Sequence, residues 1–153
     1  MQKNLRLKRG FTLIELLVVI GVLAVLFAIV LIAINPARQF SQANNTKRAS
    51  DVNTVLNAVH QYAADNKGAL PAGIDTTIRT ITDATDGANI CAALVPKYVA
   101  ALPVDPLTNN GTSVTDCTAS YSANYQIVKS ASDNRITISA PAAELSETIS
   151  ITR

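Results

Sequence analysis

One uninterrupted apolar segment dominates the distribution of hydrophobic positions along the chain. Residues 11–34 are 24 positions with a single charge, Glu15. In a helix they extend roughly 36 Å at about 1.5 Å per residue, enough to cross a hydrocarbon core of about 30 Å. The segment therefore predicts a membrane-spanning helix. A carboxylate near its start is costly in lipid, so Glu15 needs a compensating partner.

The next segment, residues 35–66, is amphipathic. Proline lacks a backbone donor, so Pro36 predicts a kink or a new helix with Pro36 in its first turn. Apolar side chains then recur at steps of three and four: Phe40, Ala43, Val52, Val55, Leu56, Val59, Tyr62 and Ala63. We expect this stripe to pack on a globular part. The other face should be solvated or meet neighbouring subunits, with Lys47 and Arg48 most simply solvated; it carries Arg38, Lys47, Arg48, Asp51, Asn53, Asn57 and Gln61.

Residues 67–153 predict a small globular head. Gly68 and Pro71 stop the long helix, and residues 72–90 have the Thr, Asp, Gly and Ala content of a variable loop with short structure at most. A short helical turn is expected at 91–95, and strands are expected at 120–129, 134–140 and 148–152, where isoleucine alternates with polar residues. A small antiparallel sheet with one face on the amphipathic helix follows. The predicted fold class is α+β.

Charge divides the chain into two parts. The first ten residues hold four basic residues and no acid, and the remainder holds nine basic and eleven acidic residues. Basic residues before an apolar helix place the N-terminus in the cytoplasm and the head outside it. The mildly acidic body lacks the basic face of a nucleic-acid binder, so no nucleic-acid partner is predicted.

The two cysteines, Cys91 and Cys117, have 25 residues between them, a spacing that fits no compact metal motif. In an exported head they predict a disulfide worth roughly 3 to 4 kcal/mol in the loop-entropy model. Two free, buried thiols are the alternative.

Candidate chemistry elsewhere is sparse. The single histidine, His60, has no Cys, Asp or Ser companion at a telling spacing, and no G-x-S-x-G motif occurs. Oxygen donors gather at Asp105, Asn109, Asn110 and Asp116, but without the spacing of an EF-hand, so turn chemistry is favoured over calcium. We predict no catalytic residue, no metal site and no cofactor.

The junction between the basic residues and the apolar segment is the most specific motif. A secretory signal peptide has a shorter apolar stretch and a small-residue cleavage site, which this chain lacks. The string Arg9-Gly10-Phe11-Thr12-Leu13-Ile14-Glu15-Leu16 closely resembles the processing site of type IV prepilins and type II secretion pseudopilins. The end of the long helix, YAADNKGALP, also resembles that family. A plain single-pass anchor with a shallow Glu15 is the alternative.

The resemblance implies a sequence of events. A prepilin peptidase cuts between Gly10 and Phe11, and Phe11 is N-methylated. The new α-amino group is largely protonated near neutral pH, and Glu15 lies one helical turn away on the same face. In the family this carboxylate meets the N-terminal amine of a neighbouring subunit. Implied partners are copies of the chain, other pilin-like subunits, the peptidase, the lipid bilayer and an assembly platform protein in the membrane.

The resemblance also implies an organisation: a leader over 1–10, a membrane and filament-core helix over 11–34, an amphipathic helix over 35–66 and a head over 67–153. The segment Leu102-Pro103-Val104-Asp105-Pro106 resembles major pseudopilins and favours a secretion or DNA-uptake machine. A disulfide in the head is common in true type IV pilins, which serve adhesion or motility and remain an alternative. A membrane-tethered binding module is an alternative of another class. The filament would be periplasmic or extracellular, and the subunit is not predicted to be an enzyme.

Overall fold

The computed structural model describes residues 10–153, so the basic residues Lys3, Arg6, Lys8 and Arg9 lie outside the described residues. The chain divides into two compact units, with the boundary between Gln39 and Phe40. Each unit is described by itself, and the second is called the head below.

The first unit contains the helix α1, Leu13–Ile34. The helix runs through Gly21 without interruption. None of its side chains is buried. Within residues 10–153 it is the one helix long and apolar enough to cross a bilayer. It ends at Asn35, which adopts the left-handed conformation (φ 46°) that asparagine tolerates better than most residues.

The helix α2, Pro36–Asp65, enters the head and supplies one side of its core. Pro36 occupies the first position, where the missing N–H costs no hydrogen bond. At the other end Gly68 has φ 88°, and its N–H donates to the carbonyl of Ala63 at 2.8 Å. A left-handed glycine satisfies a free carbonyl of the last turn in this way and stops the helix.

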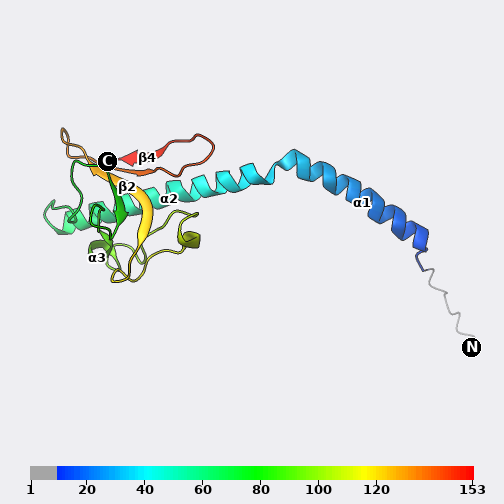
Figure 1. The fold of residues 1–153 in the computed structure, drawn as a ribbon, viewed down its shortest axis with the longest axis horizontal. Coiled ribbons are helices and arrows are strands. Elements are labelled where there is room, and N and C mark those ends of the chain that lie inside the picture. Colours follow the sequence, from blue (N-terminus) through cyan, green and yellow to red (C-terminus); the bar gives the residue numbers. More distant parts are fainter. Residues whose placement is uncertain (1–9) are drawn as a thin grey trace, which may run out of the picture. The chain divides into compact units, whose positions relative to one another are not determined.

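The head contains a four-stranded antiparallel meander in the order β1-β2-β3-β4 (Figure 1). Its strands are β1 Arg79–Thr82, β2 Ser122–Lys129, β3 Ile136–Ala140 and β4 Ile149–Thr152. The α+β class and the small antiparallel sheet are confirmed. Strand β1 lies in the segment that the sequence predicted as a loop. Two short helices complete the head: α3, Cys91–Leu94, and the 3-10 helix η1, Asn109–Gly111.

The core of the head lies between α2 and the sheet. Alternate residues of β2 and β3 point into it, as the period of two predicts. The buried hydrophobic residues of these elements are Val52, Val55, Leu56, Ala58, Val59, Ala123, Tyr125, Ile127, Ile136, Ile138 and Ala140. Burial of a Val, Leu or Ile side chain contributes about 1.5 to 3 kcal/mol, so this layer fixes the sheet on α2.

Candidate functional site

The N-terminal end of α1 is built by two polar residues. Thr12 is the N-cap, and its hydroxyl accepts a hydrogen bond from the backbone N–H of Glu15 at 3.3 Å. The Glu15 carboxylate returns the contact, since Oε2 accepts from the Thr12 N–H at 2.8 Å and from the Thr12 hydroxyl at 2.7 Å. This reciprocal arrangement is a capping box. Its pattern, threonine followed by glutamate three residues later, is readable in the sequence, but the sequence analysis did not use it.

The capping box gives Glu15 a structural role beside the predicted one. Both hydrogen bonds use Oε2, and Oε1 accepts none from residues 10–153. Phe11 is 89% exposed and directly precedes Thr12, whose backbone N–H the carboxylate already contacts. An amine formed at Phe11 would therefore arise beside a carboxylate with one oxygen free.

Gly10 is exposed, and a Cβ built on it meets nothing within 4 Å among the described residues. The peptide bond between Gly10 and Phe11 is thus open to an approaching enzyme. The basic residues of the predicted leader lie outside the described part of the chain, so the geometry concerns only the predicted cleavage point.

The surface of α1 is apolar all around. Its large hydrophobic side chains are between 50% and 84% exposed. An apolar surface of this extent in water would be strongly unfavourable, and helices that are hydrophobic all around are covered by lipid or by other protein. The helix therefore needs a bilayer or neighbouring chains.

The helix is interrupted after α1, at the position where Pro36 predicts a kink or a new helix. The Asn35 side-chain oxygen accepts from the backbone N–H of Arg38 at 3.3 Å, and the Asn35 carbonyl accepts from the same N–H at 3.1 Å. Asn35 thus ends α1 and caps α2. The two helices are separate segments because Pro36 cannot donate to the turn before it.

A buried ionic cluster lies in the head, and it contradicts the prediction that Arg48 is solvated. Arg48, predicted to be solvated, is 0% exposed. Its Nε donates to Asp105 Oδ2 at 2.7 Å, and its Nη1 donates to Glu144 Oε2 at 2.8 Å and to Asn45 Oδ1 at 3.0 Å. Asp105 is also 0% exposed. One guanidinium therefore joins α2 to two loops that are distant in sequence.

The predicted assignment of α2 faces fails at three further places. Asp51, placed on the wet face, is buried and accepts from the Tyr125 hydroxyl at 2.8 Å. Phe40 and Ala43, both placed on the packed stripe, are exposed. The signal for Arg48 was available, since it precedes Val52 by four residues and Val55 by seven, which is the spacing of one helical face. A polar residue on a buried stripe indicates a buried partner.

The electrostatics of the cluster follow from its hydrogen bonds. The hydrogen bond to Asp105 raises the pKa of Arg48, against the opposing effect of burial. Hydrogen bonds from Arg48, Asn44 and Ser41 lower the pKa of Glu144 from its ordinary value of 4.5 to about 2. Burial raises the pKa of Tyr125 above its ordinary range, and the hydrogen bond to Asp51 adds to this effect. Arg48 and Glu144 are therefore ionised at neutral pH.

Glu144 makes the stability of the head depend on acid pH. Because its pKa is lower in the folded chain, its ionised form favours folding above pH 4.5, and that contribution is lost as the pH falls toward about 2. We expect Glu144→Gln to remove this part of the pH dependence, and Ser41→Ala, which deletes one donor, to remove a fraction of it. Denaturant midpoints of the full chain between pH 7 and pH 2 measure the effect. Parallel curves for wild type and Glu144→Gln would contradict it.

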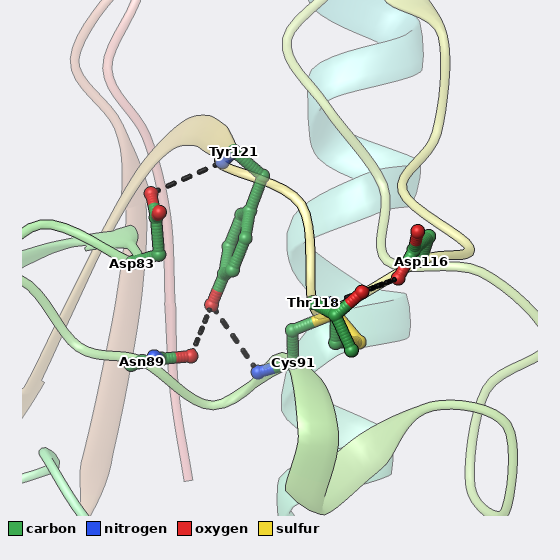
Figure 2. Close-up of a disulfide and its surroundings, with 7 residues drawn as sticks. Asp83, Asn89, Cys91, Asp116, Thr118 and Tyr121 are labelled. Atoms are coloured by element: carbon green, nitrogen blue, oxygen red, sulfur yellow. Dashed lines mark hydrogen bonds between the residues drawn. A yellow bond between two sulfur atoms is a disulfide. The ribbon is translucent and has the colours of Figure 1, made fainter.

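The predicted disulfide between Cys91 and Cys117 is confirmed, with a Cα–Cα distance of 5.5 Å (Figure 2). It ties α3 to the segment before β2. Beside it the Tyr121 hydroxyl donates to Asn89 Oδ1 at 2.9 Å and accepts from the Cys91 N–H at 3.3 Å. The backbone N–H of Tyr121 donates to Asp83 at 3.0 Å, so this corner of the head is held by covalent and polar contacts together.

Two of the oxygen donors of residues 105–116, Asp105 and Asp116, have hydrogen-bond partners within the head. Asp105 binds Arg48, and Asp116 accepts from the Thr118 hydroxyl at 2.6 Å. In residues 10–153 no three His, Cys, Asp or Glu side chains gather in a way that could hold a metal ion. His60 has a buried Nε2 without a hydrogen-bond partner in the described residues. We assign it no chemistry.

Comparison with known proteins bears on the N-terminal site. The family model described as the prokaryotic N-terminal methylation motif matches residues 5–31, which include Gly10, Phe11 and Glu15. Searches of curated proteins and of solved structures found no match. The chain therefore carries the N-terminal methylation signature of type IV pilins and pseudopilins, and its long apolar helix and small antiparallel sheet are consistent with the pilin fold.

Proposed function

We propose that the chain is a prepilin that is cut between Gly10 and Phe11 and N-methylated at Phe11. The proposal is carried by the methylation motif together with the exposed peptide bond between Gly10 and Phe11, which lies shortly before α1. Prepilin peptidase is the partner for this step. The leader would be residues 1–10, and the apolar helix, residues 11–34, would be kept.

The processed chain is inserted in the cytoplasmic membrane with its N-terminus in the cytoplasm and the globular part of the head, residues 67–153, outside. It then leaves the bilayer to join a filament, in which α1 exchanges lipid for the helices of other subunits. The basis is the apolar surface of α1, of which no part is buried. Residues 35–66 link this core to the head, and a platform protein in the membrane would receive the subunit.

Glu15 gives the filament its register. Oε1 is free of hydrogen bonds from the described residues. It can therefore accept a hydrogen bond from the Phe11 amine of the neighbouring subunit while Oε2 keeps its bonds to Thr12. A misplaced neighbour would leave an ammonium and a carboxylate unpaired in an apolar environment, which is strongly unfavourable. The ion pair thus selects one position along the helix.

The filament is most simply that of a type II secretion or DNA-uptake machine. Asp105 lies in the segment Leu102-Pro103-Val104-Asp105-Pro106 and is the buried partner of Arg48. This pseudopilin-like segment is therefore bound to α2. The Cys91–Cys117 disulfide favours the second candidate, a type IV pilin for adhesion or motility. Deletion of the gene separates them: loss of protein export or DNA uptake supports the first, and loss of surface pili with normal export supports the second.

The mass of the mature chain tests the proposed processing. In cells with a prepilin peptidase we expect a chain that begins at Phe11 and carries one methyl group on its amine. Cells that lack the peptidase provide the control and should yield the full chain. A mature protein that begins at Met1, or a cut chain without the methyl group, would contradict the proposal.

A further inference from the structure

Large apolar side chains are exposed at few places in the head. Within Phe40–Arg153 they are Phe40, Ile78, Leu107 and Leu145. Three of these four are tied to the buried ionic cluster, and Ile78 is not. The hydrogen bonds of the cluster therefore also fix the backbone at or beside three exposed apolar side chains.

Hydrogen bonds place Phe40 and Leu145 near each other. Phe40 directly precedes Ser41, whose hydroxyl donates to Glu144 Oε1 at 2.8 Å, and Leu145 directly follows Glu144. The Asn45 side chain also bonds the Glu144 backbone, accepting from its N–H at 2.9 Å and donating to its carbonyl at 2.8 Å. The loop between β3 and β4 is therefore clamped on the first turns of α2 inside the head.

The same cluster holds Leu107. Its backbone N–H donates to Asp105 Oδ1 at 2.9 Å, while Asp105 binds Arg48. Figure 1 shows the β3–β4 loop and the loop that carries η1 both extending along α2 toward the end at which α2 enters the head. The three exposed side chains thus belong to one end of the head.

The conformation of Leu145 also requires an explanation. Leu145 has φ 58° and Ser146 has φ 57°, so two successive residues without the freedom of glycine are left-handed. Leu145 nevertheless stays 44% exposed, so burial does not repay the strain. Strained backbone that the surrounding contacts hold in place is typical of functional segments.

We propose that Phe40, Leu107 and Leu145 form a contact surface for a second copy of this chain in the filament. The proposal rests on the proposed function, because it is the filament that brings the second copy. We call these three residues the entry surface. Glu144 is a positioning residue for Leu145, since its bonds to α2 hold the loop in its strained form.

The partner that covers the entry surface is inferred from the distance along the chain between Phe40 and the end of α1. Phe40 is six residues after Ile34, the end of α1, so they are at most roughly 20 Å apart even along a fully extended chain. Packed helices lie about 8 to 10 Å apart, so a copy that packs on α1 near Ile34 is within reach of Phe40. A second copy that covers the apolar surface of α1 is therefore the partner that we propose for the entry surface.

Site-specific photocrosslinking tests the entry surface in intact filaments of the full chain. A benzoylphenylalanine at position 40, 107 or 145 should give dimers of the chain after irradiation. The same probe at Ile78, which is 63% exposed, is the matched control and should give about ten-fold less dimer. Equal dimer yields at 78 and 145, or adducts only with another protein, would overturn the proposal. Wild-type chains that form no filament would overturn the proposed function itself, whatever the probes show.

A second variant tests the positioning role. We expect Glu144→Ala to lower the dimer yield from a probe at position 145 several-fold and to leave the yield from position 107 unchanged, because Arg48 still holds Asp105. A merely structural role would lower both yields together. Equal losses at 107 and 145 would therefore overturn the positioning role of Glu144, and an unchanged yield at 145 would do so as well.

Discussion

Filaments are expected not to form when Glu15 is replaced by glutamine, although the chain is still inserted, cut and methylated. Glutamine at this position keeps a capping box with Thr12, so α1 still begins correctly. It cannot neutralise the Phe11 amine of a neighbour, and that charge would stay unpaired among apolar helices. Sedimentation of sheared filaments from cells that express the variant alone measures the loss. We expect assembly to fall below detection.

Thr12→Ala is the matched control for the Glu15 variant. It removes the N-cap hydroxyl and leaves the carboxylate, so a filament should still form with a slightly less stable α1 start. If Glu15→Gln assembled like the wild type, the carboxylate would be only a cap. If Thr12→Ala also abolished assembly, the cap rather than the charge would be the essential feature.

Arg48→Met carries the largest expected loss of stability in the head. Methionine removes the guanidinium and leaves Asp105, which is 0% exposed, as a buried charge without its partner. Breaking a buried ion pair in this way costs about 3 to 5 kcal/mol of unfolding free energy. Denaturant unfolding of the full chain in detergent, followed by the four tyrosines, all of which lie in the head, measures the change.

Lys47→Met provides the comparison for Arg48. Lys47 pairs with Asp51 at 2.6 Å, but its side chain is 41% exposed, so its loss should cost only about 0 to 1 kcal/mol. Combining Arg48→Met with Asp105→Asn should recover part of the stability, because the uncompensated charge is then gone. A loss of less than about 1 kcal/mol in Arg48→Met would contradict the role of the buried pair.

The elements of this fold were predictable where the pattern is local. An unbroken apolar run specifies α1, and an alternation of isoleucine with polar residues specifies β3 and β4. The disulfide was predictable because two cysteines in an exported head have few other uses. Strand β1 was not predicted as a strand because it has a single isoleucine, Ile81, within a segment that is rich in Thr, Asp and Gly. Its antiparallel pairing with β2 stabilises a strand that its own sequence does not indicate.

The buried cluster could not be predicted in the same way. The partners of Arg48 lie 57 and 96 residues further along the chain, so no local pattern identifies them. The sequence gives only the position of Arg48 on the buried stripe of α2. Whether such an arginine turns outward or finds a carboxylate depends on the tertiary arrangement of two loops.

The N-terminal site, unlike the buried cluster, could be predicted from a local pattern in the sequence. Gly10, Phe11 and Glu15 stand together in a motif that the methylation family model also matches, so the sequence alone indicates the chemistry. The structure adds the capping box, which engages one carboxylate oxygen and leaves the other free. The proposed division of Glu15 between its own helix and a neighbour rests on that second oxygen.

A filament structure at side-chain resolution tests the central claim most directly, by the distance from the Phe11 amine of one subunit to the Glu15 carboxylate of the next. Our account predicts a methylated amine within about 4 Å of that carboxylate, the range of an ion pair. Glu15 should still contact its own Thr12 through the other oxygen. Subunits in which Glu15 contacts only Thr12, with every neighbouring amine out of reach, would contradict the account.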